Sequence, residues 1–189
     1  MLREDEGDSR IDGLINCVGM AHFCTYHKLP LSKIQHIHKT NIDSLHFMLQ
    51  FLGRANSLLS SQPFFLNISS IAALYPSPYS SVYGATKAYL SNALIAISQE
   101  QPTTTFLNLQ PHYVTTKMVG NLRDWDTASP QDIVEGSMRL LGKRSHGSGC
   151  IRHELVQEFM WIVGWATKRR FKDMVQRAER LEKARRREK

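Results

Sequence analysis

The sequence lacks several features that would place it in a specialised class. No run of about 18 apolar residues could span a bilayer, and the polar start MLREDEGDSR is unlike a signal peptide. Three cysteines without CxxC spacing predict neither a disulfide framework nor a thiolate zinc site. His36 and His38 are two residues apart, so on a helix their rings would point about 200° apart. We therefore expect no bound metal.

Net charge is absent from most of the chain. The formal charge of +7 comes from residues 168–189, which contain eleven Lys and Arg and four Asp and Glu. Residues 1–167 contain thirteen residues of each sign. No aromatic stacking platform accompanies the basic tail. We therefore do not expect a nucleic-acid partner, and we interpret 189 residues of ordinary composition as one globular domain.

The hydrophobic pattern alternates between short buried runs and amphipathic segments. Strand-like runs occupy residues 13–19, 66–69 and 105–110, and a short one is predicted at 149–153. Helices are predicted at 31–60, where Pro63 follows the helix end, at 81–99 before Pro102, and at 130–142 after the capping residue Ser129. A C-terminal helix is expected from residue 154.

This alternation predicts an α/β fold, a mostly parallel doubly wound sheet with helices on both faces. Such sheets bind ligands beyond the carboxyl ends of their strands. The predicted ends lie at residues 16–19, 69–70 and 111–116. The stretch NISSIAALYPSPYSSVYGATKAYL, residues 67–90, begins at one of these ends, so we expect it to carry a site.

Tyr83 and Lys87 are spaced i,i+4, which places them on one face of a helix. An ammonium group beside a phenol stabilises the phenolate, so we expect Lys87 to lower the Tyr83 pKa and make the pair an acid–base. An exposed helix with an unremarkable Tyr and Lys is the alternative. Ser70, thirteen residues before Tyr83, and Asn41, a polar residue in an apolar helix, favour the site.

Together these residues resemble the short-chain dehydrogenase/reductase family. In that family a strand-end NNxG or NAG motif (here Asn16-Cys-Val-Gly19), a serine, YxxxK and a helix asparagine precede a PGxxxT motif (here Pro111-His-Tyr-Val-Thr-Thr116). The runs LINCVGM, KTNIDS, LNISS and QPHYVTTKM look like the branch containing very-long-chain 3-oxoacyl-CoA reductase and 17-beta-hydroxysteroid dehydrogenases. The resemblance implies a partial Rossmann-like sheet, strands 4 to 7 of the family.

The resemblance also implies roles for individual residues. Tyr83 would protonate a substrate carbonyl, Ser70 would hydrogen-bond it, and Lys87 would hold the nicotinamide ribose of NADP(H). Asn41 would anchor a proton-relay water, completing the catalytic set Ser70, Tyr83, Lys87 and Asn41. Tyr83, like Lys87, would also contact the cofactor. The remaining cofactor contacts would come from Asn16 and Gly19 on the ribose and adenine side, and from Pro111, Val114 and Thr116 at the carboxamide.

Departures from the family pattern restrict these expectations. Cys17 replaces an asparagine, His112 stands where the wider family has glycine, and no GxGxxG-like turn exists to hold a pyrophosphate. We therefore expect an N-terminally truncated domain at 12–153, preceded by a lead-in at 1–11, with its first strand exposed as a sheet edge. The chain would carry the catalytic half of a ketone reductase. The rival hypothesis is an inert remnant or interaction protein.

The predicted C-terminal segment, 154–189, combines apolar and basic residues. Phe159, Trp161, Ile162 and Trp165 followed by the basic tail fit a helix at a membrane surface, whereas a core-docked helix with a solvated end fits them equally well. The resemblance favours membrane contact and implies the endoplasmic reticulum membrane, a hydrophobic acyl-CoA or steroid substrate, and a homodimer. Residues 74–81 and 118–126 would be either substrate loops or ordinary connections.

Overall fold

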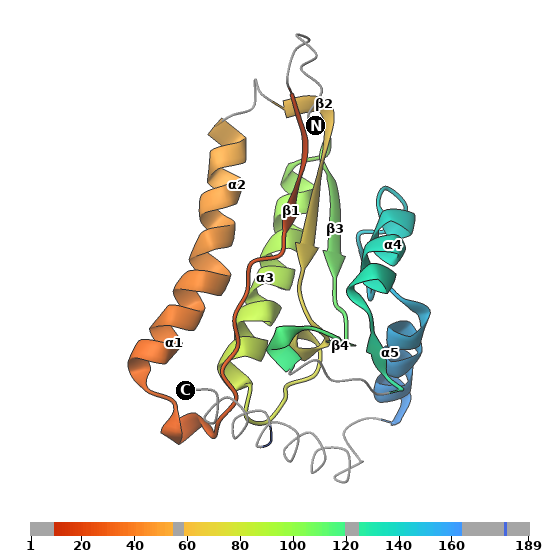
Figure 1. Ribbon diagram of the computed structural model, residues 1–189. Coiled ribbons are helices and arrows are strands. Elements are labelled where there is room, and N and C mark those ends of the chain that lie inside the picture. The colour runs from red at the N-terminus through yellow and green to blue at the C-terminus, as the bar shows by residue number, and fades with distance from the viewer. Residues whose placement is uncertain (1–9, 55–58, 120–124, 164–179, 181–189) are drawn as a thin grey trace.

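A parallel sheet lies at the centre of the molecule (Figure 1). The computed structural model describes residues 10–54, 59–119, 125–163 and 180. Its four-stranded sheet has the spatial order β1-β2-β3-β6, and every neighbouring pair is parallel. The strands are β1 (Ile11–Asn16), β2 (Leu59–Ile68), β3 (Thr105–Leu109) and β6 (His146–Gly147). The predicted α/β class with a doubly wound parallel sheet is confirmed.

Helices cover both faces of this sheet. On one side lie α1 (Leu31–His38), α2 (Ser44–Arg54) and α3 (Ser81–Glu100), and on the other lie α4 (Pro130–Leu140) and α5 (Ile151–Val163) (Figure 1). Successive residues of β2 serve the two faces, because side chains alternate along a strand. Phe65 packs with Leu90 and Leu94 of α3, whereas Leu66 packs with Ile133 of α4.

The predicted helix over 31–60 and the strand at 66–69 need correction. Five residues in a π-helical turn, η2 (Lys39–Asp43), separate α1 from α2, and α2 ends at Arg54. The strand β2 already begins at Leu59 and contains Pro63. Proline is tolerated there because the register between β1 and β2 shifts, from Ile11 opposite Leu59 to Gly13 opposite Phe64. The Phe64 ring occupies the space that a side chain at residue 13 would need.

The predicted strand at 149–153 is wrong. The last strand among the described residues is β6, which begins three residues earlier, and α5 already begins at Ile151. Gly149 has φ +80°, a left-handed conformation that interrupts an extended strand. Helix α4 also approaches closely here, since a side chain at Gly136 would collide with the Gly149 carbonyl. The boundary placed at residue 154 therefore falls inside α5 rather than at its start.

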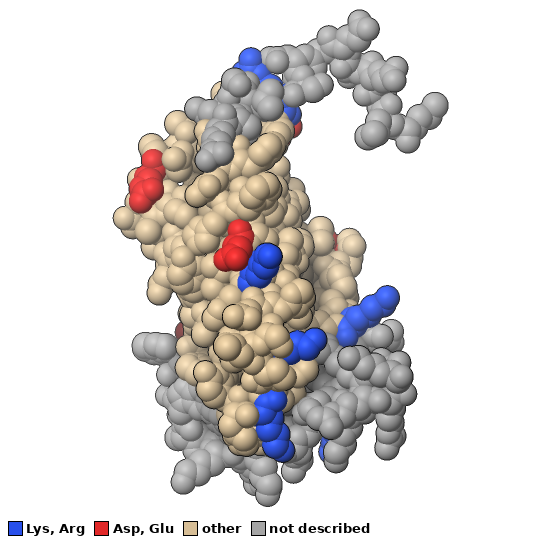
Figure 2. Space-filling view, turned by 90° about the vertical axis from the view of Figure 1, so that its left-hand side faces the viewer, with Lys and Arg blue, Asp and Glu red and all other residues tan. Residues whose placement is uncertain are grey.

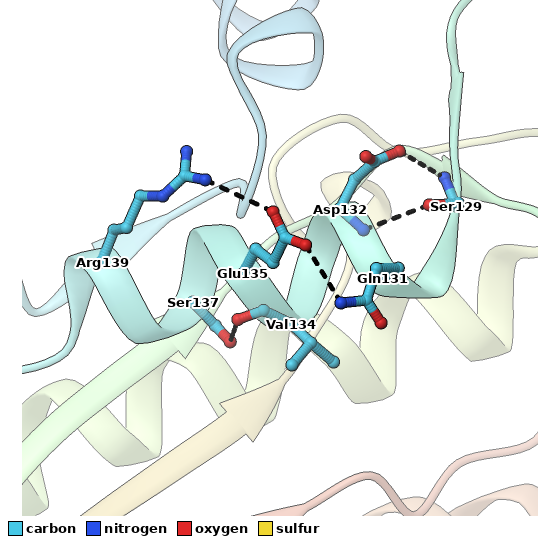
Figure 3. A network of polar contacts seen from close by, with 7 residues as sticks. All are labelled: Ser129, Gln131, Asp132, Val134, Glu135, Ser137 and Arg139. Carbon is cyan, nitrogen blue, oxygen red and sulfur yellow. Dashed lines mark hydrogen bonds and ion pairs between the residues drawn. The ribbon is translucent and has the colours of Figure 1, made fainter.

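The start of α4 is confirmed. The Ser129 hydroxyl accepts a hydrogen bond from the Asp132 N–H, and the Asp132 carboxylate accepts one from the Ser129 N–H (Figure 3). This capping box and Pro130 at the first helical position define the start. The segment before α4 contains a parallel pair, β4 (Tyr113–Val114) and β5 (Thr127–Ala128). Two-residue strands carry no recognisable periodicity.

One flank of the described molecule is open. In the described part of the chain β1 pairs with β2 alone, and Ile15 is 53% exposed. Phe47 and Phe51 of α2 are 74% and 55% exposed. Most of the described surface in Figure 2 is uncharged, with scattered Lys, Arg, Asp and Glu side chains. The expected edge strand is thus confirmed. Among the described residues, no helix has both the length and the apolarity needed to cross a bilayer.

Candidate active site

A cavity of about 660 Å³ opens at the carboxyl ends of the parallel strands. Its wall includes the predicted residues Gly19, Ser70, Tyr83, Lys87, Pro111, Val114 and Thr116. Three separate strand ends and the first turns of α3 contribute them, as expected for an open parallel sheet. Two predicted residues, Asn16 and Asn41, do not line the cavity. The structure therefore brings together seven of the nine residues.

Ser70 and Tyr83 meet across a close approach of two helices. Ser70 follows β2 and caps the short helix η4 (Ile71–Ala73) by accepting a hydrogen bond from the Ala72 N–H at 3.1 Å. Helix α3 approaches η4 at Gly84, where an added Cβ atom would lie 3.0 Å from the Ala72 carbonyl oxygen. The glycine of YGATK thus allows Tyr83 to reach the serine.

The Tyr83 phenol does not have the lowered pKa that the sequence predicts. Burial raises the pKa of Tyr83, and a side-chain hydrogen bond with Ser70 opposes this only in part. The Lys87 ammonium lies 5.9 Å from the centre of the Tyr83 ring and donates instead to the Ile68 carbonyl oxygen at 2.8 Å. The expectation of a lowered Tyr83 pKa is therefore wrong here, because desolvation by burial is the largest effect on the phenol.

Lys87 is itself a perturbed group. Its side chain is 3% exposed, and burial lowers the pKa of Lys87 from 10.5 to about 8, an effect that Cys17 opposes. Gly19 packs against its ammonium group, since a Cβ atom at that position would lie 3.2 Å from Lys87 Nζ. A lysine in a cavity wall whose pKa burial lowers to about 8 is a strong candidate for proton exchange.

Asn41 lies in the π-helical turn η2 with its side chain fully buried. Its Oδ1 accepts from the Met20 N–H at 2.8 Å, and its Nδ2 donates to the Met20 carbonyl and to Thr86 Oγ1. Thr86 in turn donates to the Tyr83 carbonyl at 2.7 Å. The Asn41 side chain therefore ties the loop after β1 to the Tyr83 turn.

Asn16 is also fully buried and bonded. Its Oδ1 accepts from the Val18 N–H, and its Nδ2 donates to Asn67 Oδ1 at 2.7 Å. Asn67 donates to Asn108 Oδ1 at 2.8 Å. Sequence reasoning missed Asn67 and Asn108, although a polar residue at the same position of successive apolar strands is a readable signal.

The segment after β3 forms another wall. The Pro111 carbonyl accepts from the Ile71 N–H at 2.9 Å, and Val114 lies in the β4–β5 pair beside Ala128. The two loops whose roles were left open also contribute: Tyr75, Ser77, Pro78 and Ser80 line the cavity, as do Met118, Val119, Trp125 and Asp126. Residues 120–124 lie outside the described chain.

A histidine and aspartate cluster beside this wall was not predicted. His112 Nδ1 lies 3.5 Å from Asp126 Oδ2, and the His112 N–H donates to His153 Nδ1 at 3.2 Å. His153 is fully buried, which lowers its pKa. The described residues contain no group of three or more His, Cys, Asp or Glu arranged to hold a metal ion.

Comparisons with known proteins agree with this geometry. The curated relatives include very-long-chain 3-oxoacyl-CoA reductase from Bos taurus, 34% identical over 94 residues, which are 48% of this chain and 30% of the relative. The 17-beta-hydroxysteroid dehydrogenase type 3 of Mus musculus is 31% identical over 152 residues, 76% of this chain and 48% of the relative. The chain thus matches between 30% and 48% of the length of these relatives.

Solved structures share the fold. A 3-ketoacyl-(acyl-carrier-protein) reductase from Brucella melitensis complexed with NADH aligns with a TM-score of 0.63 at 18% identity, covering 74% of this chain and 65% of its own. A 7beta-hydroxysteroid dehydrogenase structure aligns with a TM-score of 0.66 at 16% identity, covering 89% and 66%. The family model for short chain dehydrogenases matches residues 5–127. The chain therefore belongs to the short-chain dehydrogenase family.

Proposed function

We propose that this chain carries the proton-handling part of an NADPH-dependent ketone reductase. The observation that carries the proposal is the convergence of Ser70, Tyr83 and Lys87 on the wall of one cavity. A hydroxyl, a phenol and a lysine whose pKa is lowered to about 8 form a set that can bind a carbonyl oxygen and deliver a proton to it.

Tyr83 is the proton donor in this proposal. The substrate carbonyl oxygen accepts hydrogen bonds from Ser70 and Tyr83, and the phenol proton passes to that oxygen as the carbonyl carbon is reduced. The nicotinamide, when bound, supplies the hydride to that carbon, and the product is a secondary alcohol. Burial keeps the phenol protonated at neutral pH because it raises the pKa of Tyr83, which suits a donor.

Lys87 and Asn41 serve to return a proton to the Tyr83 phenolate in this proposal. Lys87 does not lower the pKa of the resting phenol, but its ammonium, 5.9 Å from the centre of the Tyr83 ring, would attract the negative charge of the phenolate once the proton has left. The side-chain amide of Asn41 already bonds Met20 and Thr86, so we assign the relay water to the Asn41 backbone carbonyl in the π-helical turn. The side chain then serves to hold that turn in place.

The cavity wall fits the nicotinamide end of the cofactor. Gly19 leaves room beside the Lys87 ammonium, where a ribose hydroxyl could be held, and Pro111, Val114 and Thr116 form the facing wall for the carboxamide. Asn16 would act by shaping the β1 end, since its side chain is buried. We propose that the cofactor is NADP(H) rather than NAD(H).

The proposed substrate is a long hydrophobic ketone. Apolar side chains dominate the rest of the cavity wall, among them Phe23, Ile71, Met118, Trp125 and Met160. The names of the curated relatives support a 3-oxoacyl-CoA, as in fatty-acid elongation, or a steroid. We extend this to the endoplasmic reticulum membrane as the location. The exposed Leu155 and Phe159 of α5 support contact of the C-terminal segment with a membrane surface.

A second candidate is an interaction protein without turnover. The open flank at Ile15 and the exposed Phe47 and Phe51 favour it, because uncharged apolar surface of this kind is suited to a protein partner. Tyr89 and Ile95 of α3 are exposed as well, which favours a homodimer through α2 and α3. This candidate predicts that the 189-residue chain does not bind NADPH.

Substitution of Tyr83 tests the reductase. We expect Tyr83→Phe to lower the rate of NADPH oxidation with a 3-oxoacyl-CoA or a ketosteroid by about 10²- to 10⁴-fold, while the Kd for NADPH stays within about twofold. Tyr89→Phe is the matched control, since this exposed tyrosine of the same helix bonds His46 and not the cavity. A Tyr83→Phe enzyme with wild-type turnover would contradict the assignment.

Titration of NADPH against the purified chain separates the two candidates. Saturable binding that Gly19→Val weakens supports the cofactor site, because the added side chain would press on Lys87 Nζ. Gly53→Val, at a glycine with open space around it, is the control for the loss of a glycine. Absence of binding at millimolar NADPH would favour the interaction protein.

A further inference from the structure

A continuous chain of side-chain hydrogen bonds crosses the sheet beneath the cavity. We name it the asparagine chain, and its members are Asn16, Asn67, Asn108, Ser91 and Ser69. The three asparagines lie side by side in the strand register, Asn16 opposite Asn67 and Asn67 opposite Asn108. All five side chains are at least nine-tenths buried, from 0% exposed at Asn16 to 7% at Ser91.

The hydrogen bonds run from β1, the edge strand, to α3, the helix that carries Tyr83 and Lys87. After the two bonds between asparagines, Asn108 Nδ2 donates to Ser91 Oγ at 3.0 Å. Ser91 Oγ lies 3.0 Å from Ser69 Oγ, and Ser69 Oγ donates to the Lys87 carbonyl oxygen at 3.3 Å. The last acceptor is thus the backbone of Lys87 itself, whose ammonium bonds the adjacent Ile68 carbonyl.

The direction of the chain is fixed at both ends. The Val18 N–H can only donate, so Asn16 must present its oxygen to Val18 and its amide hydrogens to Asn67. The Lys87 carbonyl can only accept, so Ser69 must donate to it, and the Ser91 hydroxyl is left to donate to Ser69. Each link therefore has one donor and one acceptor, and a polar network satisfied in this way holds its members rigidly.

We propose that Asn67, Asn108 and Ser91 are positioning residues, which fix the Lys87 turn of α3 against the ends of β1, β2 and β3. A catalytic role for this positioning rests on the proposed reductase function. Gly19, Ser70 and Pro111 follow these strand ends and line the cavity. The same network therefore determines the positions of three parts of the cavity wall relative to Lys87. Breaking it at Asn67, Asn108 or Ser91 should admit water to the buried ammonium without removing any group that lines the cavity.

The proton affinity of Lys87 is the readout. Because burial lowers the pKa of Lys87 to about 8, water entering beside it should return that pKa toward 10.5. We expect Ser91→Ala and Asn108→Ala to raise it by about one pH unit, a tenfold gain in proton affinity. The measurement is pH titration of ¹³C-labelled lysine by NMR on the full chain, with the Lys87 signal identified by its loss in Lys87→Arg.

Val156→Ala is the matched control. Val156 is 4% exposed in α5 and lies outside the asparagine chain, so its truncation lowers stability without touching the network. Ser91→Ala keeps a good helix former in α3, so it remains interpretable if Asn108→Ala does not fold. An unchanged Lys87 pKa in Ser91→Ala, or an equal shift in Val156→Ala, would overturn the inference.

The outcomes also separate this inference from the proposed function. A raised Lys87 pKa in Ser91→Ala supports positioning of the lysine even if Tyr83→Phe retains turnover, in which case the reductase proposal fails alone. Loss of turnover in Tyr83→Phe with no Lys87 shift in Ser91→Ala rejects the positioning role alone.

Discussion

Two sets of polar side chains with similar chemistry occupy opposite environments in this molecule. The asparagine chain is buried at the strand ends, and each amide or hydroxyl in it has a protein partner. The α4 network, made of Ser129, Gln131, Asp132, Glu135 and Arg139, lies on the exposed face of α4 and at its start (Figure 3). Water can replace any partner lost from the second set but reaches the first only through a structural change. Burial, rather than bond count, should therefore decide what each set contributes.

The largest expected loss of stability is for substitution of Asn67, the central asparagine of the asparagine chain. Asn67→Ala leaves Asn16 Nδ2 and Asn108 Oδ1 without their partners in a place that water does not reach. Each buried orphan costs about 1 to 3 kcal/mol, so we expect the free energy of unfolding to fall by about 4 kcal/mol. Urea denaturation followed by circular dichroism measures it. A loss below about 1 kcal/mol would mean that the buried and exposed sets do not differ.

Lys87 sharpens the comparison, because its burial destabilises the protein at neutral pH. The folded pKa of about 8 lies below the unfolded value of 10.5, so between these pH values the unfolded chain binds more protons. The free energy of unfolding should therefore rise with pH across this window by about 3 kcal/mol relative to Lys87→Met. Below pH 8 both states are protonated and the difference between the proteins should be constant.

Denaturant titrations at several pH values from 7 to 10.5 give this slope. Lys33→Met, at an exposed position of α1, controls for the loss of one positive charge. Parallel pH dependence of the wild type and Lys87→Met would show that Lys87 is hydrated in the folded state, and would remove the basis for its proposed role in proton exchange.

The cap of α4 should have a smaller effect. Ser129→Ala removes the acceptor for the Asp132 N–H at a helix start that water can reach, so we expect a loss of about 1 kcal/mol. Ser129→Asp keeps an acceptor at the cap and should restore most of it. Thermal unfolding monitored by circular dichroism suffices. A loss as large as that of Asn67→Ala would contradict the distinction by burial.

The same contrast explains what the sequence could predict. The order of strands and helices, the start of α4 and the placement of Ser70, Tyr83 and Lys87 follow from local patterns and from the YxxxK and strand-end motifs. The recurring asparagine of the apolar strands is visible in the sequence, but the contact of Asn67 with Asn16 and Asn108 is not, because it depends on the register between distant strands. The predicted lowering of the Tyr83 pKa was wrong for a related reason. Desolvation of the phenol, which raises this pKa, depends on the assembled cavity and not on the local sequence. Residues 1–9, Trp165 and most of the basic tail lie outside the described residues.

The smallest expected effect is that of the ion pair on α4. Arg139 Nη2 lies 3.3 Å from Glu135 Oε2, and the two side chains are 76% and 52% exposed. A double-mutant cycle of Glu135→Ala and Arg139→Ala should give a coupling of about 0.3 kcal/mol that disappears in 1 M salt. The matching cycle of Asn67→Ala and Asn108→Ala should give a coupling above about 1 kcal/mol that salt does not change. Equal couplings in the two cycles would show that the buried bonds gain nothing from their surroundings, and positioning of Lys87 by the asparagine chain would lose its energetic basis.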